Sequence, residues 1–276
     1  MNFEEKKRKN RRKRGQISPE DISPYVDLPT EGLVEMLQGT DPQKRTIAAV
    51  ILGDLGDERG ILPLCSALTT EKSLYSRIAI SEALSKIGEP SVAYLIELLG
   101  EIGKNQETML PDYYFKKKSF PLVRDMAGRT MVQIGKPATP YLIDFLESSD
   151  EFKVQQALDV VGAIAAKTGD RRALNPLLTH LERETRDCRG SDGVTLWKII
   201  RACSGFKKSE KAVDPLLEIL ERDYPPPIIW ETLRTLGQIR IATPQVRERV
   251  GSFINNEQPE VRVAAENAWK LLGFAP

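Results

Sequence analysis

The stretch DPQKRTIAAVILGDLGDERGILPLCSAL, residues 41–68, has the pattern of one complete helix–turn–helix unit. Asp41 is a good N-cap residue, and Pro42 fits the first helical position, which needs no amide proton. Apolar residues recur at helical spacing as far as Leu55, and Gly56 suits the left-handed conformation that ends many helices. A return helix fills the rest of the stretch. Two such short helices cannot bury their apolar faces alone, so the unit predicts further copies stacked beside it.

Copies of both parts recur along the chain. The glycine turn appears as LGD (55–57), IGEP (87–90), IGKP (134–137) and TGDRR (168–172). The return helix appears as LPLCSAL (62–68), VAYLIELL (92–99), TPYLIDFL (139–146), NPLLTHL (175–181) and DPLLEIL (214–220). Aligned copies lie about 30 to 47 residues apart, which is the spacing of helical repeats with one insertion.

These turns and return helices resemble the HEAT repeats, in particular the short phycobilisome-lyase-like type (PBS lyase HEAT-like repeats). The resemblance covers roughly residues 30–276 and implies an armadillo-type fold. We therefore predict an all-α, right-handed α-α superhelix, a HEAT-like solenoid of about six helix pairs. A disordered basic arm (1–18) and a proline-punctuated linker (19–29) are predicted to precede it, and an insertion (100–121) to interrupt it.

The basic arm carries most of the chain's charge asymmetry. Residues 1–16 hold eight basic and two acidic side chains, a net charge of +6 against +1 for the whole chain. Such a block, with only Phe3 as an apolar anchor, is predicted to be disordered. It can bind phosphates of RNA or DNA, stay a solvated tail, fold back on the acidic remainder, or act as a nuclear address in a eukaryote. The candidate nucleic-acid residues are Lys6, Lys7, Arg8, Lys9, Arg11, Arg12, Lys13 and Arg14.

The insertion holds the best single candidate for a specific contact. Three aromatic residues are followed directly by three lysines: Tyr113, Tyr114, Phe115, Lys116, Lys117 and Lys118. Aromatic faces beside lysines suit single-stranded nucleic acid, which stacks on the rings and is neutralised by the charges. The alternative, which we favour, is that the aromatics pack the insertion onto neighbouring helices while the lysines stay in solvent, as ordered loops commonly do.

The return helices carry carboxylates that we expect to line a mildly acidic concave groove. The candidate partner-binding residues there are Glu97, Glu101, Asp144, Glu147 and Glu218. Negative charge repels a phosphate backbone, so the expected partner is a protein with a basic or mixed-charge segment.

Arg45, Arg77, Arg124 and Arg262 stand early in successive first helices. The resemblance implies that such arginines form a structural ladder with the Asp of the turn, interrupted here where Gln155 replaces arginine. Two tryptophans also match between LWKIIRACSGF (196–206) and IWETLRTLGQI (229–239), and we predict that they pack between repeats.

Residues that carry chemistry are sparse. The one histidine, His180, has no sequence partner for metal or triad chemistry and is expected at a surface or boundary position. Cys65 and Cys203 occupy apolar helix positions, which predicts buried thiols and a reducing cytoplasm; Cys188 lies apart from both. The His–Glu pairs of HEAT-fold deoxyhypusine hydroxylases are missing, as are phosphate-loop and dinucleotide motifs. No apolar run is long enough to span a membrane.

The sequence therefore favours a non-catalytic, cytoplasmic protein-binding scaffold or assembly factor that uses the concave face of its solenoid, without metal or cofactor. The first alternative is association with RNA or DNA through the basic arm. The second is a bilin-lyase-like or other HEAT-fold enzyme, although no residue commits the chain to a bilin.

Overall fold

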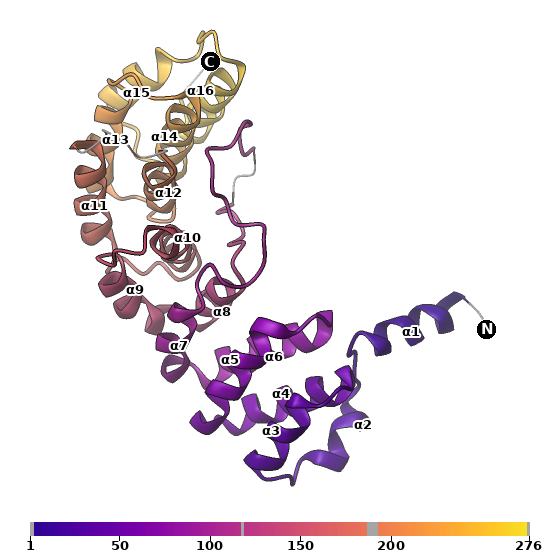
Figure 1. Cartoon of the computed structure of the whole chain (residues 1–276). Coiled ribbons are helices and arrows are strands. Elements are labelled where there is room, and N and C mark those ends of the chain that lie inside the picture. The colour runs from indigo at the N-terminus through magenta and orange to yellow at the C-terminus, as the bar shows by residue number, and fades with distance from the viewer. Residues whose placement is uncertain (1–2, 117–118, 187–192, 275–276) are drawn as a thin grey trace. The chain divides into compact units, whose positions relative to one another are not determined.

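A computed structural model of the chain describes residues 3–116, 119–186 and 193–274, and within these ranges it contains helices and no strands (Figure 1). First helices alternate with return helices, as in an α-solenoid of helix pairs. The chain divides into two compact units. One comprises residues 1–104 and 125–138, and the other residues 105–124 and 139–276.

The first unit begins with helix α1 and a short linker and continues as alternating helices. In chain order its elements are α1 (Phe3–Lys13), α2 (Pro19–Ile22), η1 (Ser23–Tyr25), α3 (Thr30–Gln38), α4 (Pro42–Leu55), η2 (Glu58–Gly60), α5 (Ile61–Thr70), α6 (Leu74–Ile87), η3 (Glu89–Ser91), α7 (Val92–Glu97), α8 (Met126–Ile134) and η4 (Lys136–Ala138). Here α4, α6 and α8 are first helices, whereas α3, α5 and α7 are return helices.

The second unit repeats the alternation with longer first helices. Its elements are α9 (Thr139–Phe145), α10 (Glu151–Thr168), α11 (Leu174–Arg186), α12 (Val194–Cys203), η5 (Glu210–Ala212), α13 (Val213–Ile219), α14 (Pro226–Ile239), α15 (Pro244–Gly251) and α16 (Pro259–Leu271). Its first helices are the even-numbered ones and its return helices the odd-numbered ones. No helix of the described residues combines the length and apolar character that a membrane crossing needs.

The caps that the sequence predicted are present in α4. Asp41 accepts a hydrogen bond of 2.9 Å from the amide of Gln43, and Gly56 adopts a left-handed conformation with φ of 66°. The third first helix, α8, begins at Met126 because buried Asp125 caps it. The Asp125 carboxylate accepts from the amides of Gly128 (2.6 Å) and Gly100 (3.0 Å), so it starts the helix and ties down the beginning of the insertion.

Successive first helices make their closest contacts through glycine and alanine. A Cβ atom added to Gly53 would lie 2.6 Å from the Cα atom of Ala83, so α4 and α6 meet almost backbone to backbone. The same close approach recurs twice in the second unit. An added Cβ would lie 2.7 Å from the Cα atom of Ala202 at Gly162, and 2.8 Å from the Cα atom of Ala268 at Gly237. Return helices contact one another much less than first helices do.

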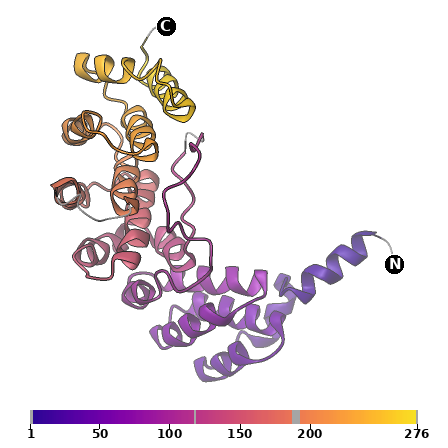
Figure 2. The same ribbon diagram turned by 45° about the horizontal axis from the view of Figure 1, so that its top comes forward.

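This difference corrects the predicted position of the groove. In the second unit the first helices form the closely packed row and the return helices the more widely spaced one (Figure 2). Within this unit the row curves with its first helices on the inner side, so the return helices lie on the outer side and not on a concave one (Figure 1). The surface between neighbouring return helices is divided into separate hollows.

The arginines also make contacts other than those predicted. Arg45, Arg77 and Arg262 each donate to the carbonyl oxygen six residues earlier, at 2.9, 3.0 and 2.8 Å, and so tie the preceding loop to the helix. Arg124 does not match them, because the equivalent position, four residues after the N-cap, is Arg129 in α8. The turn aspartate Asp57 instead accepts from its neighbour Arg59 and from Thr30 of α3. A ladder of these arginines on the turn aspartates is therefore not formed.

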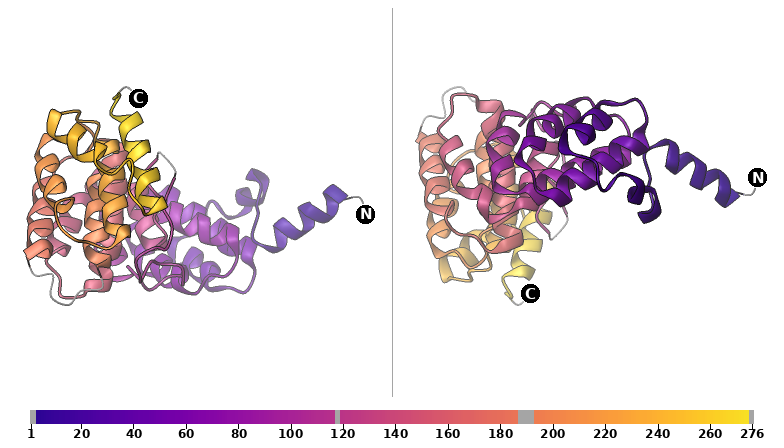
Figure 3. Two further views of the ribbon diagram at one scale, coloured as in Figure 1. Left: turned by 90° about the horizontal axis from the view of Figure 1, so that it is seen from above. Right: turned by 90° about the horizontal axis from the view of Figure 1, so that it is seen from below.

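The basic arm is helical in the structure, whereas its composition predicted disorder. Helix α1 extends away from the other helices of its unit (Figure 3), and none of its side chains is buried. Glu4 and Glu5 in the first turn and basic residues in the last turn suit the helix dipole. The end of the arm is anchored: Arg12 forms a two-fold hydrogen-bonded pair with Asp21, which holds the pKa of that carboxyl well below its usual range.

The glycine–alanine contact predicts an unusual effect of a very small substitution. We expect Gly53→Ala to destabilise the chain by about 1–3 kcal/mol, because the added methyl group must push α4 and α6 apart. Chemical denaturation followed by circular dichroism measures the change.

The matched control is Gly32→Ala in α3, where the nearest side-chain atom would lie 3.7 Å from the new Cβ. This variant should be neutral or more stable by about 0.5–1 kcal/mol, since alanine favours the helix. Equal stabilities of the two variants would contradict the close contact.

Candidate functional site

Residues 105–116 and 119–124 form a strap that lies along the first helices of the second unit, on the side away from the return helices (Figure 1, Figure 2). Tyr114 is buried and meets the ring of Trp230 on α14 edge to face, with ring centroids 5.5 Å apart. The guanidinium of Arg234 lies 5.1 Å from the ring centroid of Phe115, and Phe120 fills the space above Gly162 of α10.

The aromatic–lysine run of the strap is thus divided between two environments. Tyr114 and Phe115 pack on the helices, which is the alternative that the sequence analysis favoured. Tyr113, with 72% of its surface exposed, and Lys116 face solvent. Lys117 and Lys118, like Cys188, lie outside the described residues.

A charged network is buried beneath the strap. Asp159 of α10 accepts hydrogen bonds from Lys198 Nζ (3.1 Å) and Arg201 Nε (3.1 Å) of α12. Arg201 also reaches the Glu107 carboxylate on the strap (3.2 Å), and that carboxylate pairs in turn with Arg124 (3.0 Å). Lys198 and Arg201 are both buried.

The environment shifts the pKa values of two acids in this region, Asp159 and Glu231, in opposite directions. Burial alone would raise the pKa of Asp159, but the charges of Arg201 and Lys198 outweigh it and hold that pKa below its ordinary value. Burial is also the largest influence on the pKa of Glu231 of α14. Here burial outweighs the ion pair with Arg234 at 2.8 Å, so this pKa is raised.

Polar atoms in the same region are incompletely bonded. Among the described residues, Trp197 Nε1, Glu231 Oε2 and Arg234 Nε are buried and have no hydrogen-bond partner. The three side chains are neighbours: Trp197 and Trp230 pack edge to face at 6.3 Å, and Glu231 pairs with Arg234. This packing confirms that the two tryptophans are inter-repeat contacts. Buried polar groups are nearly always bonded, so the cluster marks a site of interest.

Sequence reasoning missed this network, although a signal for it exists. In LWKIIRACSGF and IWETLRTLGQI the charged residues fall at equivalent positions, Lys198 with Glu231 and Arg201 with Arg234. Lys198 and Arg201 have apolar neighbours on both sides, and Glu231 and Arg234 have one on the N-terminal side, which is unusual for a charge on a solvent-facing helix surface. Glu107 carries no comparable signal, because its partner Arg201 is far away in the sequence.

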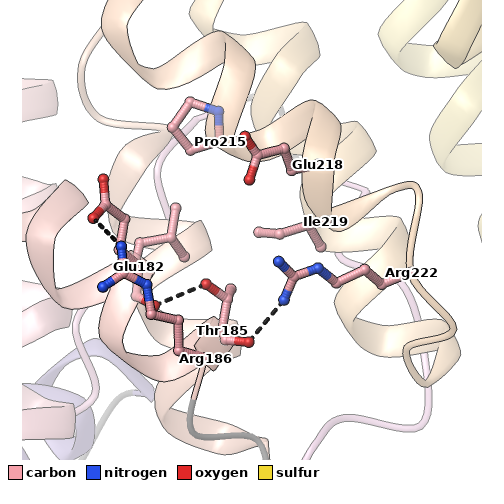
Figure 4. A pocket seen from close by; sticks show the side chains of 8 residues that line it. Glu182, Thr185, Arg186, Pro215, Glu218, Ile219 and Arg222 are labelled. Atoms are coloured by element: carbon pink, nitrogen blue, oxygen red, sulfur yellow. Dashed lines mark hydrogen bonds and ion pairs between the residues drawn. The ribbon is translucent and has the colours of Figure 1, made fainter.

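A second candidate surface lies between the return helices of the same unit. The hollow between α11 and α13 has a volume of about 220 Å³, and its lining includes the apolar residues Leu181 and Ile219, of which Ile219 is labelled in Figure 4. Arg186 pairs with Glu182 at 3.3 Å, and Arg222 donates to the carbonyl oxygen of Thr185 at 2.7 Å, so the rim carries both signs of charge.

The neighbouring hollow, between α13 and α15, is more acidic. It has a volume of about 380 Å³, and its charged lining residues are Asp214, Glu218, Glu221, Glu248 and Arg249. Arg249 is already paired with Glu221 at 2.5 Å. Glu218 lines both hollows, so the two form consecutive parts of one surface.

The other predicted acidic residues are exposed but are not gathered at these hollows. Glu97 and Glu101 belong to the first unit, and Asp144 and Glu147 lie at the end of α9 in the second. Glu147 is paired with Arg183 of α11 at 3.1 Å, which reduces the negative charge that the sequence suggested there. Glu218 is the one of the five that lines the two hollows described above.

The thiols and the histidine show no arrangement for catalysis. Burial raises the pKa of the Cys65 thiol to about 11 and that of Cys203 to about 12. His180 is buried, contrary to its predicted surface or boundary position, because it lies on the inner face of α11, and burial lowers its pKa. Within the described residues no group of three or more His, Cys, Asp and Glu side chains is suited to hold a metal ion.

Comparison with known proteins identifies the repeat type of one part of the chain. Residues 30–102 match a family described as HEAT repeats. No curated protein matches the chain. A designed armadillo repeat protein is 16% identical over 88% of this chain and 100% of its own, with a TM-score of 0.39. Another, in complex with peptide (KR)4, is 15% identical over 89% of this chain and 100% of its own, with a TM-score of 0.39.

The buried network predicts a large, pH-dependent cost for one substitution. Asp159→Asn should destabilise the chain by about 3–5 kcal/mol at neutral pH, because two buried cations lose their shared counter-charge. The folded-state pKa of Asp159 is lowered, so the advantage of the native chain should be complete above the unfolded pKa of about 4 and shrink as the pH falls below it.

Urea denaturation between pH 3 and 8 measures both effects. Asp54→Asn, which removes an exposed pair with Lys86, serves as the control and should cost less than about 1 kcal/mol. A D159N chain as stable as D54N at pH 7 would show that the network is not stabilising.

Proposed function

We propose that the chain is a non-catalytic protein-binding scaffold or assembly factor, and that return helices α11, α13 and α15 bind an extended, basic or mixed-charge segment of a partner. The observation that carries the proposal is the pair of adjoining hollows that share Glu218. A cytoplasmic setting is consistent with the free thiols of Cys65 and Cys203.

Charge favours a cationic partner at this surface. The hollow between α13 and α15 has four carboxylates and one guanidinium at its lining, and that guanidinium is engaged by Glu221. Such a surface attracts basic side chains and speeds their association. Leu217 in this hollow, and Leu181 and Ile219 in the next, offer apolar contact to the methylene stems of lysine and arginine.

Spacing sets the pattern of the expected segment. Closely packed helices lie roughly 8–10 Å apart, so the hollows between the more widely spaced return helices repeat at about 10 Å, the upper end of that range. An extended polyproline-type chain advances ~3.1 Å per residue, or about 9 Å over three residues. A basic residue at every third position would therefore place successive side chains in successive hollows.

The distribution of perturbed groups supports binding in preference to catalysis. Asp159, Arg201 and Glu231, whose pKa values are shifted by burial and by neighbouring charges, lie inside the second unit and do not line the hollows. Perturbed groups in a cleft would be the sign of an active site.

Charge reversal at the hollows tests this proposal. Glu218→Lys with Glu248→Lys should weaken binding of a fluorescein-labelled peptide with arginine at every third position and serine between by at least about ten-fold, because attraction becomes repulsion. Fluorescence anisotropy at 50 and 150 mM salt gives the two dissociation constants.

Glu35→Lys with Glu82→Lys, at exposed positions of α3 and α6 in the first unit, makes the same change in net charge; it is the matched control and should leave the affinity unchanged. Equal weakening by both variants would mean that net charge, and not this surface, decides binding.

A second candidate function is association with single-stranded nucleic acid through α1. Seven of its 11 residues are basic and none of its residues is buried. Lys6, Lys9 and Lys13 stand on one face of this helix at spacings of three and four. This arrangement offers a cationic stripe to a phosphate backbone.

Removing that stripe gives a quantitative prediction. For a labelled 20-nucleotide oligouridine, Lys6→Gln, Lys9→Gln and Lys13→Gln together should reduce the slope of log affinity against log salt by about 2, since each lost phosphate contact accounts for ~0.7. An unchanged slope would rule out α1 as the contact.

A further inference from the structure

We propose that the face of α10, α12 and α14 beneath the strap is a second peptide-binding site, and that the strap is its internal ligand. The partner that would replace the strap is an extended segment with a carboxylate followed, seven residues later, by two aromatic residues, as Glu107 is followed by Tyr114 and Phe115. This inference is independent of the function proposed for the return helices, because it uses the opposite layer of the unit.

The strap is held in the way a bound peptide is held. Its described residues, 105–116 and 119–124, form no helix, and the named contacts to the helices are made largely by side chains. Glu107 pairs with Arg201 of α12, the ring of Tyr114 packs against Trp230, and the ring of Phe115 packs against the guanidinium of Arg234. One main-chain contact adds to these, from Arg234 to the carbonyl oxygen of Ser119 at 3.1 Å.

The net positive charge of the covered face favours an anionic occupant. Lys198, Arg201 and Arg234 outnumber the acids Asp159 and Glu231 there, and the pKa of Glu231 is raised toward the neutral form. The strap supplies the missing negative charge through Glu107. An acidic segment is therefore the complement of this face, whereas a basic segment suits the return helices.

The strap provides only some of the ion pairs and hydrogen bonds that the polar groups of this face can make. Its Glu107 carboxylate is divided between Arg201 and the strap's own Arg124, so a partner's carboxylate without such a neighbour could pair with Arg201 alone. Beneath it, Trp197 Nε1, Glu231 Oε2 and Arg234 Nε have no partner among the described residues. An occupant that bonds to these atoms would gain where the strap does not.

The outer side of the strap also shows that it is an incomplete covering layer. Met109, Tyr113 and Leu122 are large apolar side chains with more than two thirds of their surface exposed. The strap thus leaves much of its own apolar surface in water, whereas a bound segment without these side chains would not.

Binding of the strap sequence in trans tests the proposal on the full chain. The probe is a fluorescein-labelled synthetic peptide, KNQETMLPDYYFK, identical to residues 104–116. The double variant Glu107→Gln with Tyr114→Ala, which loosens the internal strap, should bind this peptide at least ten-fold more tightly than the native chain does. Fluorescence anisotropy measures both dissociation constants.

A control peptide, KNQQTMLPDYAAK, has a Gln in place of the carboxylate and two Ala in place of the aromatic pair, and it should bind neither chain. Equal binding of both peptides, or no tighter binding by the double variant, would overturn the proposal. If the double variant loses its helical circular dichroism, the single variant Glu107→Gln, which keeps all the packing, takes its place. The proposal would then be contradicted if the Glu107→Gln chain bound the peptide no more tightly than the native chain does.

Discussion

The close approach of consecutive first helices is the constraint on which the rest of the structure depends. Gly53 meets Ala83, Gly162 meets Ala202 and Gly237 meets Ala268 with no room for a further methyl group. Backbones at this distance make a tightly packed layer, and its helices α10, α12 and α14 are buried along most of their length. The return helices contact one another much less, and hollows lie between them. The same feature therefore produces both the rigid row and the surfaces on its two sides.

Those surfaces differ in chemistry. The return-helix side of the second unit is open, with carboxylates such as Glu218 in solvent. The first-helix side holds buried cations, with the strap over them. Burying Lys198 and Arg201 is costly unless each is paired, and Asp159 and Glu107 provide those pairs from two different parts of the chain. The strap thus contributes to the stability of the layer that it covers, while its own exposed apolar residues show that it is not part of the solenoid core.

The parts of the fold that local chemistry determines could be predicted from the sequence. The N-cap at Asp41, the left-handed Gly56 and the buried leucines of the return helices depend on residues within a few positions of one another. The parts that depend on distant residues could not. Asp125 caps α8 and also accepts from the distant amide of Gly100, and Glu107 is placed by Arg201. Composition predicted a disordered arm, yet Arg12 forms an ion pair with Asp21 that anchors the end of helix α1. The candidate site was accordingly only partly foreseen: Tyr114 and Phe115 were named, but the charges beneath them were not.

Amide hydrogen exchange of the native chain, followed by mass spectrometry, tests the central claim most directly. If close glycine–alanine contacts make the first helices the rigid layer, amides of α10, α12 and α14 should exchange slowest in the second unit, and those of α11, α13 and α15 clearly faster. Return helices as strongly protected as the first helices, or more so, would contradict the account.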